Sequence, residues 1–199
     1  MFLQNLRACT NDCHKKLELN SLSVALLSNT VNENIYCTYL TRLYNFVKGF
    51  EQYVYPPLSP YFINIGDRKK AHFIEEDLNT QQCVIDKHTL LEEAFFKETY
   101  TDVYLAAGAL YVLEGSTLGG QIIIKHFQKH MPSAKVNAAY FSGYQQRTGS
   151  MWKEFLQQLT ALPQSTQQEQ QISTGAIITF KIIDGLLSKN NEKIIVYEH

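Results

Sequence analysis

Two sets of residues in this 199-residue sequence combine types and spacings that could serve a chemical function. In the first, steps of three or four residues place four polar side chains on one helix face: Arg7, Thr10, His14 and Glu18. A neutral imidazole can bind iron through one nitrogen while its other nitrogen donates to a carboxylate. Glu18, one turn after His14, suits that supporting role. Spacing alone leaves open the alternative of a solvated His–Glu pair on a surface helix.

The second set consists of four glycines inside the longest helical run of the sequence: Gly108, Gly115, Gly119 and Gly120. Each glycine costs about 1 kcal/mol relative to alanine in a helix interior, so another interaction must compensate. Gly115 and Gly119 share one face, which is bare of side chains and could admit another backbone or a flat ligand. Gly119 and Gly120 together also permit a bend. Tight helix–helix packing or a simple kink is the alternative explanation.

A third pattern, the pair His126 and His130, is a weaker candidate for a metal site. The two imidazoles are four residues apart on one helix face, but no third ligand is evident. They lie among Lys125 and Lys129 near the end of a predicted helix, where the helix dipole favours cations. We therefore expect no metal ion there.

The elements that position these residues are predicted to be helices. The chain has only 10 glycines and 5 prolines, and its apolar residues recur every three or four positions. We expect helices over about residues 3–19, 21–29, 32–54, 67–79, 87–98, 100–131, 148–162 and 166–189. The segment YPPLSP (55–60) ends the third helix, and residues 131–146 form an aromatic connection. The sequence thus predicts one all-α domain over residues 1–190 and a C-terminal tail over 191–199.

Composition and charge exclude several classes of protein. Hydrophobic residues make up 45% and aromatic residues 12%, which is too much apolar material for a disordered chain. A formal net charge of -1 provides no global attraction to nucleic acid or anionic membranes. No apolar run approaches the ~20 residues of a bilayer span, and the N-terminus lacks the apolar core of a secretory signal. We expect a cytoplasmic protein that binds neither nucleic acid nor a membrane.

The four cysteines contain no CxxC pair: Cys9, Cys13, Cys37 and Cys83. A zinc ribbon and a thioredoxin-type redox motif are therefore excluded. Covalent heme attachment is also not expected, because Cys13 and His14 follow Cys9 at the wrong spacing for CxxCH. In a reducing compartment, we expect all four cysteines to be thiols that act as small core residues.

Four segments of the chain resemble bacterial heme oxygenases. LRACTNDCHKKLE (6–18) is similar to the LRxxTxxxHxxLE segment of that family, and GALYVLEGSTLGGQIIIKHF (108–127) resembles its distal-helix signature, especially in the bacteriophytochrome-associated branch. RKKAHFIEEDL (68–78) resembles the central helix of the family, and FSGYQQRTGSMWKEF (141–155) the segment before its penultimate helix. The segments occur in the expected order and cover most of the chain, so the resemblance implies a heme-oxygenase-like helical bundle.

The resemblance also implies roles for the residues of both sets. His14 would be the proximal ligand of heme iron, and Glu18 would hold its second nitrogen. Gly115 and Gly119 would contact the porphyrin on the opposite face, where the open iron position is left for dioxygen. Animal members carry a carboxylate where this chain has Ser116. The resemblance therefore places Gly115, Ser116 and Gly119 in the catalytic region, with Ser116 or Thr117 organising the distal water.

The heme propionates need cationic partners, and two residues match family positions that provide them. These are Arg7, two turns before the predicted ligand, and Lys153 in the WKEF segment; Arg147 is a third candidate. Thr10 lies on the same face as Arg7 and His14, so we include it among the predicted heme-binding residues. Exposed ion pairs contribute only about 0–1 kcal/mol, so these cations would set heme orientation more than affinity.

The activity implied by the resemblance is oxidative cleavage of non-covalently bound heme to biliverdin, carbon monoxide and ferrous iron. Dioxygen is the oxidant, and heme is both substrate and cofactor. No flavin or nicotinamide motif is present, so the electrons would come from an external ferredoxin, flavodoxin or reductase. A bacteriophytochrome is one candidate recipient of the biliverdin. The alternatives are a heme- or bilin-binding protein without turnover and an iron-independent, thiaminase-II-like enzyme on the same fold.

Overall fold

The computed structural model describes residues 1–83, 91–131 and 138–188. Within these ranges every regular element is a helix, which confirms the predicted all-α class. The helices up to residue 99 are α1 (Phe2–Glu18), α2 (Ser21–Leu26), α3 (Glu33–Tyr53), α4 (Tyr55–Leu58), the 3₁₀ helix η1 (Ile65–Arg68), α5 (Ala71–Thr80) and α6 (Glu93–Thr99). They are followed by α7 (Val103–Ser116), η3 (Thr117–Gly119), α8 (Gly120–His130), α9 (Ala139–Ser142), η4 (Gln145–Arg147), α10 (Thr148–Ala161) and α11 (Thr166–Ser188).

Side-chain caps mark where several helices begin. Asn20 Oδ1 accepts from Leu22 N at 3.0 Å at the start of α2, and Asn32 caps α3 in the same way. Asp102 Oδ1 accepts from the first amides of α7. These residues satisfy backbone N–H groups that have no partner inside their helix, so they stabilise the helix starts.

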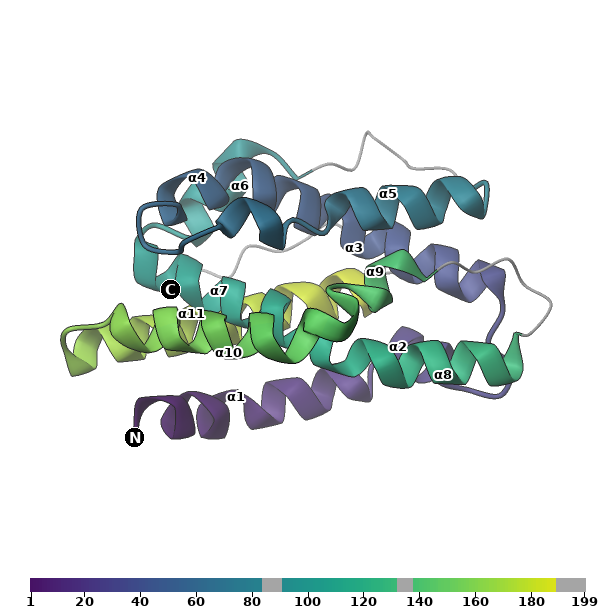
Figure 1. The fold of residues 1–199 in the computed structure, drawn as a ribbon, viewed down its shortest axis with the longest axis horizontal. Coiled ribbons are helices and arrows are strands. Elements are labelled where there is room, and N and C mark those ends of the chain that lie inside the picture. The colour runs from purple at the N-terminus through teal and green to yellow at the C-terminus, as the bar shows by residue number, and fades with distance from the viewer. Residues whose placement is uncertain (84–90, 132–137, 189–199) are drawn as a thin grey trace.

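The centre of the fold is the crossing of α7 and α11, which pass between α1 on one side and α4, α5 and α6 on the other (Figure 1). Two glycines allow their backbones to approach. A Cβ on Gly108 would lie 2.0 Å from the Ile172 carbonyl oxygen, and one on Gly175 would lie 2.0 Å from that of Leu105. Neither contact leaves room for a side chain, so the cost of these glycines is offset by close helix–helix packing.

The predicted continuous helix over residues 100–131 is wrong at its middle, because the chain forms two α-helices joined by η3. A Cβ on Gly120 would lie 2.0 Å from the Phe141 carbonyl oxygen, so α9 packs directly on the backbone at this joint. The tighter 3₁₀ turn changes the helix direction while keeping its backbone hydrogen-bonded. The short helices α4 and α9 were also not predicted.

The prediction for the cysteines is wrong at three of four positions. Cys37 of α3 and Cys83, just after α5, form a disulfide with a Cα–Cα distance of 6.0 Å. Cys9 is exposed, whereas Cys13 is partly buried against the core as expected. The disulfide partners are 46 residues apart in sequence, and only the packing of α3 against α5 brings them within bonding distance.

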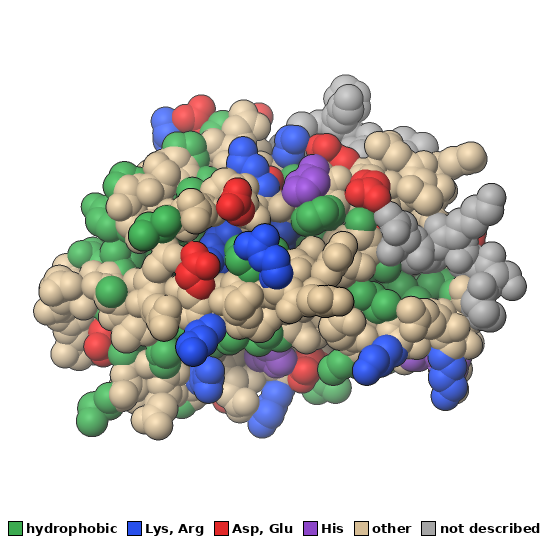
Figure 2. All heavy atoms as spheres, viewed as in Figure 1, with side chains coloured by type: hydrophobic (Ala, Val, Ile, Leu, Met, Phe, Trp, Pro, Cys, Tyr) green, Lys and Arg blue, Asp and Glu red, His purple; other side chains and the backbone are tan. Residues whose placement is uncertain are grey.

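The surface of the molecule carries charges of both signs. On the face drawn in Figure 2, Lys and Arg side chains are interspersed with Asp and Glu. Among the described helices, none combines the length and apolar composition needed to cross a bilayer. The predicted tail over residues 191–199 and the start of the helix predicted over 87–98 lie outside the described residues.

Candidate functional site

A cavity of about 380 Å³ lies between α1, α7 and α11, with further walls from α3, α9 and α10. This volume is within the range of small-molecule and cofactor sites. Five of the residues predicted from sequence line it together: Arg7, Thr10, His14, Gly115 and Ser116. The tertiary structure therefore brings the N-terminal polar set and one glycine of the second set to the same cavity, although they are 100 residues apart.

On the α1 side of the cavity, His14 and Glu18 are oriented as the spacing predicts. His14 Nδ1 lies 3.6 Å from Glu18 Oε1, slightly beyond a hydrogen bond, and the two side chains are 60% and 65% exposed. The His14 ring also meets Phe180 of α11 edge to face, with centroids 5.9 Å apart. Because Nδ1 faces the carboxylate, the other nitrogen, Nε2, is left for a ligand.

On the α7 side, Gly115 leaves the cavity wall without a side chain. A Cβ at this position would lie 3.7 Å from the indole of Trp152, so the indole borders the bare patch. The next residue, Ser116, donates its hydroxyl proton to the Leu113 carbonyl at 2.8 Å. The Ser116 oxygen still has lone pairs for a second partner, and the Tyr140 hydroxyl interacts with it.

Five aromatic residues of the cavity are not predicted from the sequence, because aromatic side chains at helical spacing are mostly core residues: Tyr39, Tyr111, Tyr140, Trp152 and Phe180. One signal could have identified Tyr111, since it precedes Gly115 by one turn and shares its helix face. The others come from helices distant in sequence, so no local pattern marks them. Together they give the cavity aromatic walls with phenol groups at several points.

The phenols of the cavity are neutral hydrogen-bond donors near pH 7. Burial raises the pKa of Tyr39 to about 12 and raises the pKa of Tyr140 further, because a phenolate would be poorly solvated there. Burial also raises the pKa of Tyr111, although Arg7 and Thr10 partly oppose the effect. These groups can orient a polar ligand atom or a water molecule without adding negative charge.

The remaining predicted site residues are not among the described residues that line the cavity. Arg147, in η4, donates to the sulfur of Met151 at 3.3 Å. Lys153 is exposed on α10, one residue after Trp152. Gly119 has no atom within 4 Å of its Cβ position, so it faces open space. Glu18 is not among the lining residues, and its Oε1 lies 3.6 Å from His14 Nδ1.

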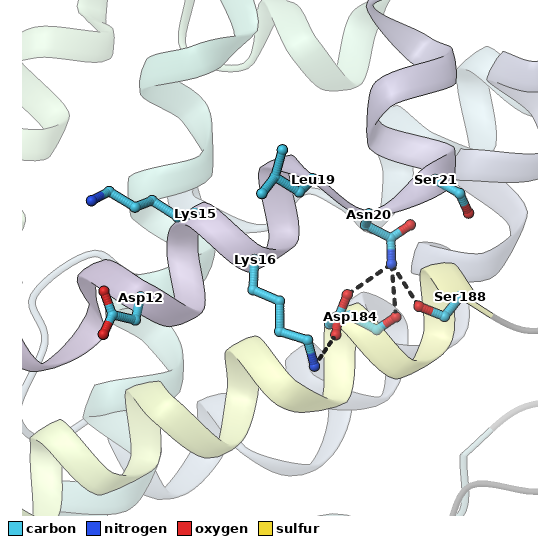
Figure 3. Close-up of a pocket in the computed structure, with 8 residues that line it drawn as sticks. All are labelled: Asp12, Lys15, Lys16, Leu19, Asn20, Ser21, Asp184 and Ser188. Atoms are coloured by element: carbon cyan, nitrogen blue, oxygen red, sulfur yellow. Dashed lines mark hydrogen bonds and ion pairs between the residues drawn. The ribbon is translucent and has the colours of Figure 1, made fainter.

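A second hollow of about 520 Å³ lies where the end of α1 meets the end of α11 (Figure 3). Its polar groups already bind one another. Asn20 Nδ2 donates to Asp184 Oδ1 at 2.8 Å and to Ser188 Oγ at 2.7 Å, and Lys16 pairs with Asp184 at 3.0 Å. The hollow is open to solvent and contains none of the predicted site residues. Its side chains join α1 and α2 to α11 near the cavity.

The structure brings no third His, Cys, Asp or Glu from the described residues to the histidine pair on α8. His126 Nε2 lies 2.9 Å from the Ser28 carbonyl oxygen, and the rings of His126 and His130 are 4.4 Å apart. Across the part of the chain that the structure describes, no group of three or more His, Cys, Asp or Glu residues could hold a metal ion. The imidazole on α1 is therefore the candidate for a ligand to iron, with the porphyrin supplying the other donors.

The residues of the cavity fit a flat, largely apolar metal complex such as heme. His14 offers one imidazole nitrogen, Gly115 provides a wall without a side chain, aromatic rings border the space, and Arg7 provides a cation. No carboxylate is among the described lining residues, so the cavity suits a ligand that carries its own negative groups. The arrangement could hold such a ligand through His14 and the aromatic walls.

Comparison with known proteins matches this chain to a family model and to solved structures. A family model described as heme oxygenase matches residues 1–189. Comparison with curated protein sequences gives no match. A heme oxygenase structure from Leptospira interrogans has a TM-score of 0.79 at 18% identity, over 94% of this chain and 98% of that chain.

The alignments with two other solved structures cover 94% of this chain and 90% of each of those chains. Heme oxygenase-1 from the cyanobacterium Synechocystis sp., in complex with heme, has a TM-score of 0.77 at 18% identity. The NO- and CO-bound heme oxygenase from Neisseria meningitidis has a TM-score of 0.77 at 22% identity. These similarities show the same helical fold.

Proposed function

Since the chain belongs to the heme oxygenase family, we propose that the cavity between α1, α7 and α11 is its heme site. The enzyme cleaves heme to biliverdin, carbon monoxide and ferrous iron, using dioxygen and electrons from an external donor. The observation that carries the proposed site is that His14 and Gly115 line one cavity from opposite helices. The imidazole of His14 would hold the iron, and the bare wall at Gly115 would let the ring lie close to the α7 backbone.

The residues of the α1 side would bind and orient the heme. His14 Nε2 would ligate the iron, and Glu18 would accept from Nδ1, which fixes the ring and strengthens the ligand. Arg7 would pair with a propionate at the cavity edge, and Thr10 beside it is buried, 4% exposed, and supports the position of Tyr111. Lys153 and Arg147 are proposed as further propionate partners, although they lie outside the cavity wall.

The residues of the α7 side would control the opposite face. Heme supplies the oxygen activation when bound, while the protein excludes bulk water and restricts the approach to one edge of the ring. Gly115 would let the backbone approach the ring, and Gly119 would keep the adjoining space free. Ser116 and Tyr140 would orient a water molecule in place of the carboxylate of the animal enzymes.

The proposed partners follow from the same chemistry. A ferredoxin, flavodoxin or reductase would supply the electrons, and a bacteriophytochrome would be a recipient of biliverdin. We propose that the reaction takes place in the cytoplasm. We propose these partners because residues 6–18 and 108–127 resemble the heme-binding segments of bacterial heme oxygenases.

The experiment that tests the proposed site and activity is heme titration of the full chain under anaerobic conditions, followed by reductant and dioxygen. We expect one heme per chain, decay of the Soret band, growth of biliverdin absorption and release of carbon monoxide. A stable heme complex that produces no bilin under these conditions would instead support the binding protein without turnover. Failure to bind heme would exclude both functions.

A further inference from the structure

A buried ionic cluster lies directly behind the bare wall of the cavity. Its members are Arg68, Lys70 and Glu114, which are 0%, 2% and 1% exposed. Arg68 Nη1 donates to Glu114 Oε2 at 2.5 Å, and Lys70 Nζ donates to the other carboxylate oxygen, Oε1. A single carboxylate therefore binds both cations, and both come from the segment that precedes α5.

Two further contacts connect the cluster to other helices. The Tyr144 hydroxyl donates to Glu114 Oε1 at 2.8 Å and accepts from Lys70 Nζ at 3.0 Å. Arg68 Nη1 also donates to the Met151 carbonyl of α10 at 3.2 Å. Arg68 Nη2 lies 3.5 Å from Glu154 Oε1, too far for a hydrogen bond, so the backbone contact is the main link to α10. The cluster joins η1, α7 and α10.

Net stability does not account for such an arrangement. Burying three charges costs their solvation, and the attraction between them repays it only in part, so well-packed apolar residues would stabilise the fold equally well. Charged groups also fix the geometry of a contact, because each hydrogen bond requires particular donor and acceptor positions. The cluster therefore holds the helices that it joins in fixed positions relative to one another.

Arg68 Nη1 donates to two residues, and each of them is followed directly in the sequence by a residue of the cavity wall. Glu114 is followed by Gly115, and Met151 is followed by Trp152. Across the cavity edge these two wall residues almost touch, since a Cβ on Gly115 would lie 3.7 Å from the Trp152 indole. A shift of either backbone would widen or close this edge.

We propose that Arg68 is a positioning residue that sets the width of the cavity edge between Gly115 and Trp152 by binding Glu114 and the Met151 carbonyl simultaneously. The α-helix α7 ends at Ser116, two residues after Glu114, and the chain continues there as the 3₁₀ turn η3. The cluster connects this joint to the Met151 carbonyl of α10. Its consequence for heme rests on the proposed function, whereas its effect on the cavity edge does not.

The chain contains a natural reporter of this edge, because Trp152 is its only tryptophan. In the full chain without heme, we expect Glu114→Gln and Arg68→Met to shift the Trp152 emission to longer wavelength and to increase its quenching by acrylamide. Both changes follow from a wider edge that admits water to the indole. Emission and quenching equal to wild type in both folded variants would overturn the proposal.

A matched control is Asp102→Ala, which removes the cap at the opposite end of α7. This change destabilises the same helix but has no contact with the cluster or the cavity. We expect Asp102→Ala to lower the unfolding temperature while the Trp152 emission of the folded protein stays at its wild-type value. An equal emission change in the control would show that general loosening of α7 is responsible, which would contradict a specific role of Arg68.

A triple variant covers the case in which a single change prevents folding. Arg68→Met with Lys70→Met and Glu114→Leu leaves no unpaired buried charge, so we expect it to fold. We expect its Trp152 emission to be shifted as well, because apolar contacts do not reproduce the directional link. A folded triple variant with wild-type emission would show that packing alone sets the edge and would refute the proposal.

A second readout uses the heme-loaded chain. We expect Glu114→Gln to retain one heme with the wild-type proximal spectrum but to bind it about fivefold more weakly. The C–O stretching band of its ferrous carbon monoxide complex should broaden, because the ligand senses a less uniform distal wall. If wild type itself binds no heme, the proposed function fails, while the fluorescence experiment still decides the role of Arg68.

Discussion

His14 Nδ1 lies 3.6 Å from Glu18 Oε1, and the histidine ring is held edge to face against Phe180 of α11. The carboxylate and the aromatic ring together restrict the imidazole from two sides. This relationship leaves Nε2 as the nitrogen that we propose for the iron, and it connects a side chain of α1 to α11. It is the basis of the first two predictions.

Replacing His14 by alanine should remove the nitrogen-ligated absorption spectrum of the heme complex. No other described histidine lines the cavity, so a protein nitrogen cannot take its place. Added imidazole should restore the spectrum by occupying the space of the missing side chain. The absorption spectrum with and without imidazole measures this, and an unchanged spectrum in His14→Ala would locate the ligand elsewhere.

Changing Glu18 to glutamine should preserve heme binding but weaken the iron–histidine bond. A neutral amide polarises the imidazole less than a carboxylate does, so the ligand donates less electron density. Resonance Raman should detect a lower iron–histidine stretching frequency. Asp12→Asn is the matched control, because it removes an exposed carboxylate of α1 that has no contact with His14. A frequency that falls equally in both variants would contradict the role of Glu18.

Replacing Gly115 by leucine should strongly reduce heme affinity. The new side chain would begin 3.7 Å from the Trp152 indole and extend into the cavity that the heme requires. Heme titration measures the effect. Undiminished affinity would show that the heme does not lie against this wall.

Gly119→Leu tests the adjoining position separately. Nothing lies within 4 Å of its Cβ, so the apoprotein should fold normally. If Gly119 borders the heme as predicted from sequence, the leucine should slow biliverdin formation by filling the space beside the ring. Unimpeded turnover would remove Gly119 from the site.

The double change Arg7→Ala with Lys153→Ala should broaden the mixture of biliverdin isomers while His14 still ligates the iron. Propionate partners set the rotation of heme in its plane, whereas the apolar faces of the ring supply most of the buried area. Because Arg7 lines the cavity and Lys153 does not, Arg7→Ala should account for most of the change. Chromatography of the products measures this. A wild-type pattern in the double variant would make Arg147, or Lys181 as an exposed cation of α11, the next candidate.

Gly175→Ala should destabilise the fold by about 3 kcal/mol, the upper end of the usual cost of overpacking. Its Cβ would lie 2.0 Å from the Leu105 carbonyl oxygen, so α7 and α11 would have to separate. Gly185→Ala in the same helix is the control, since no atom lies within 4 Å of its Cβ. It should stabilise the fold by about 0.5–1 kcal/mol. Urea unfolding of both variants provides the comparison.

The glycines show which structural roles the sequence can predict and which it cannot. Their spacing predicted an unusual helix, and it left both close packing and a ligand-facing surface open as explanations. Gly108 and Gly120 pack against other backbones, whereas Gly115 borders the cavity. The choice between these uses depends on which helix lies opposite each glycine, and that is a property of the tertiary structure.

Residues 68–78 give a second example, because in the sequence they are marked only by their resemblance to the central helix of the family. In the structure, Arg68 and Lys70 bind Glu114, while Asp77 accepts from the backbone amides of Ala139 and Tyr140. Charged residues of this kind look like a solvated surface in sequence, since their partners are tens of residues away. Burial and pairing are visible only once the helices are packed.

The sequence by itself determined the all-α class, most helix positions, the family and the His14–Glu18 pair, because helical periodicity and short motifs depend on residues only a few positions apart. The tertiary structure alone decided the aromatic walls, the Cys37–Cys83 disulfide, the break between α7 and α8 and the buried Arg68–Glu114 cluster. Each of these depends on contacts between distant segments. Their energies are those of close packing and desolvation, which act between surfaces that only the folded chain brings together.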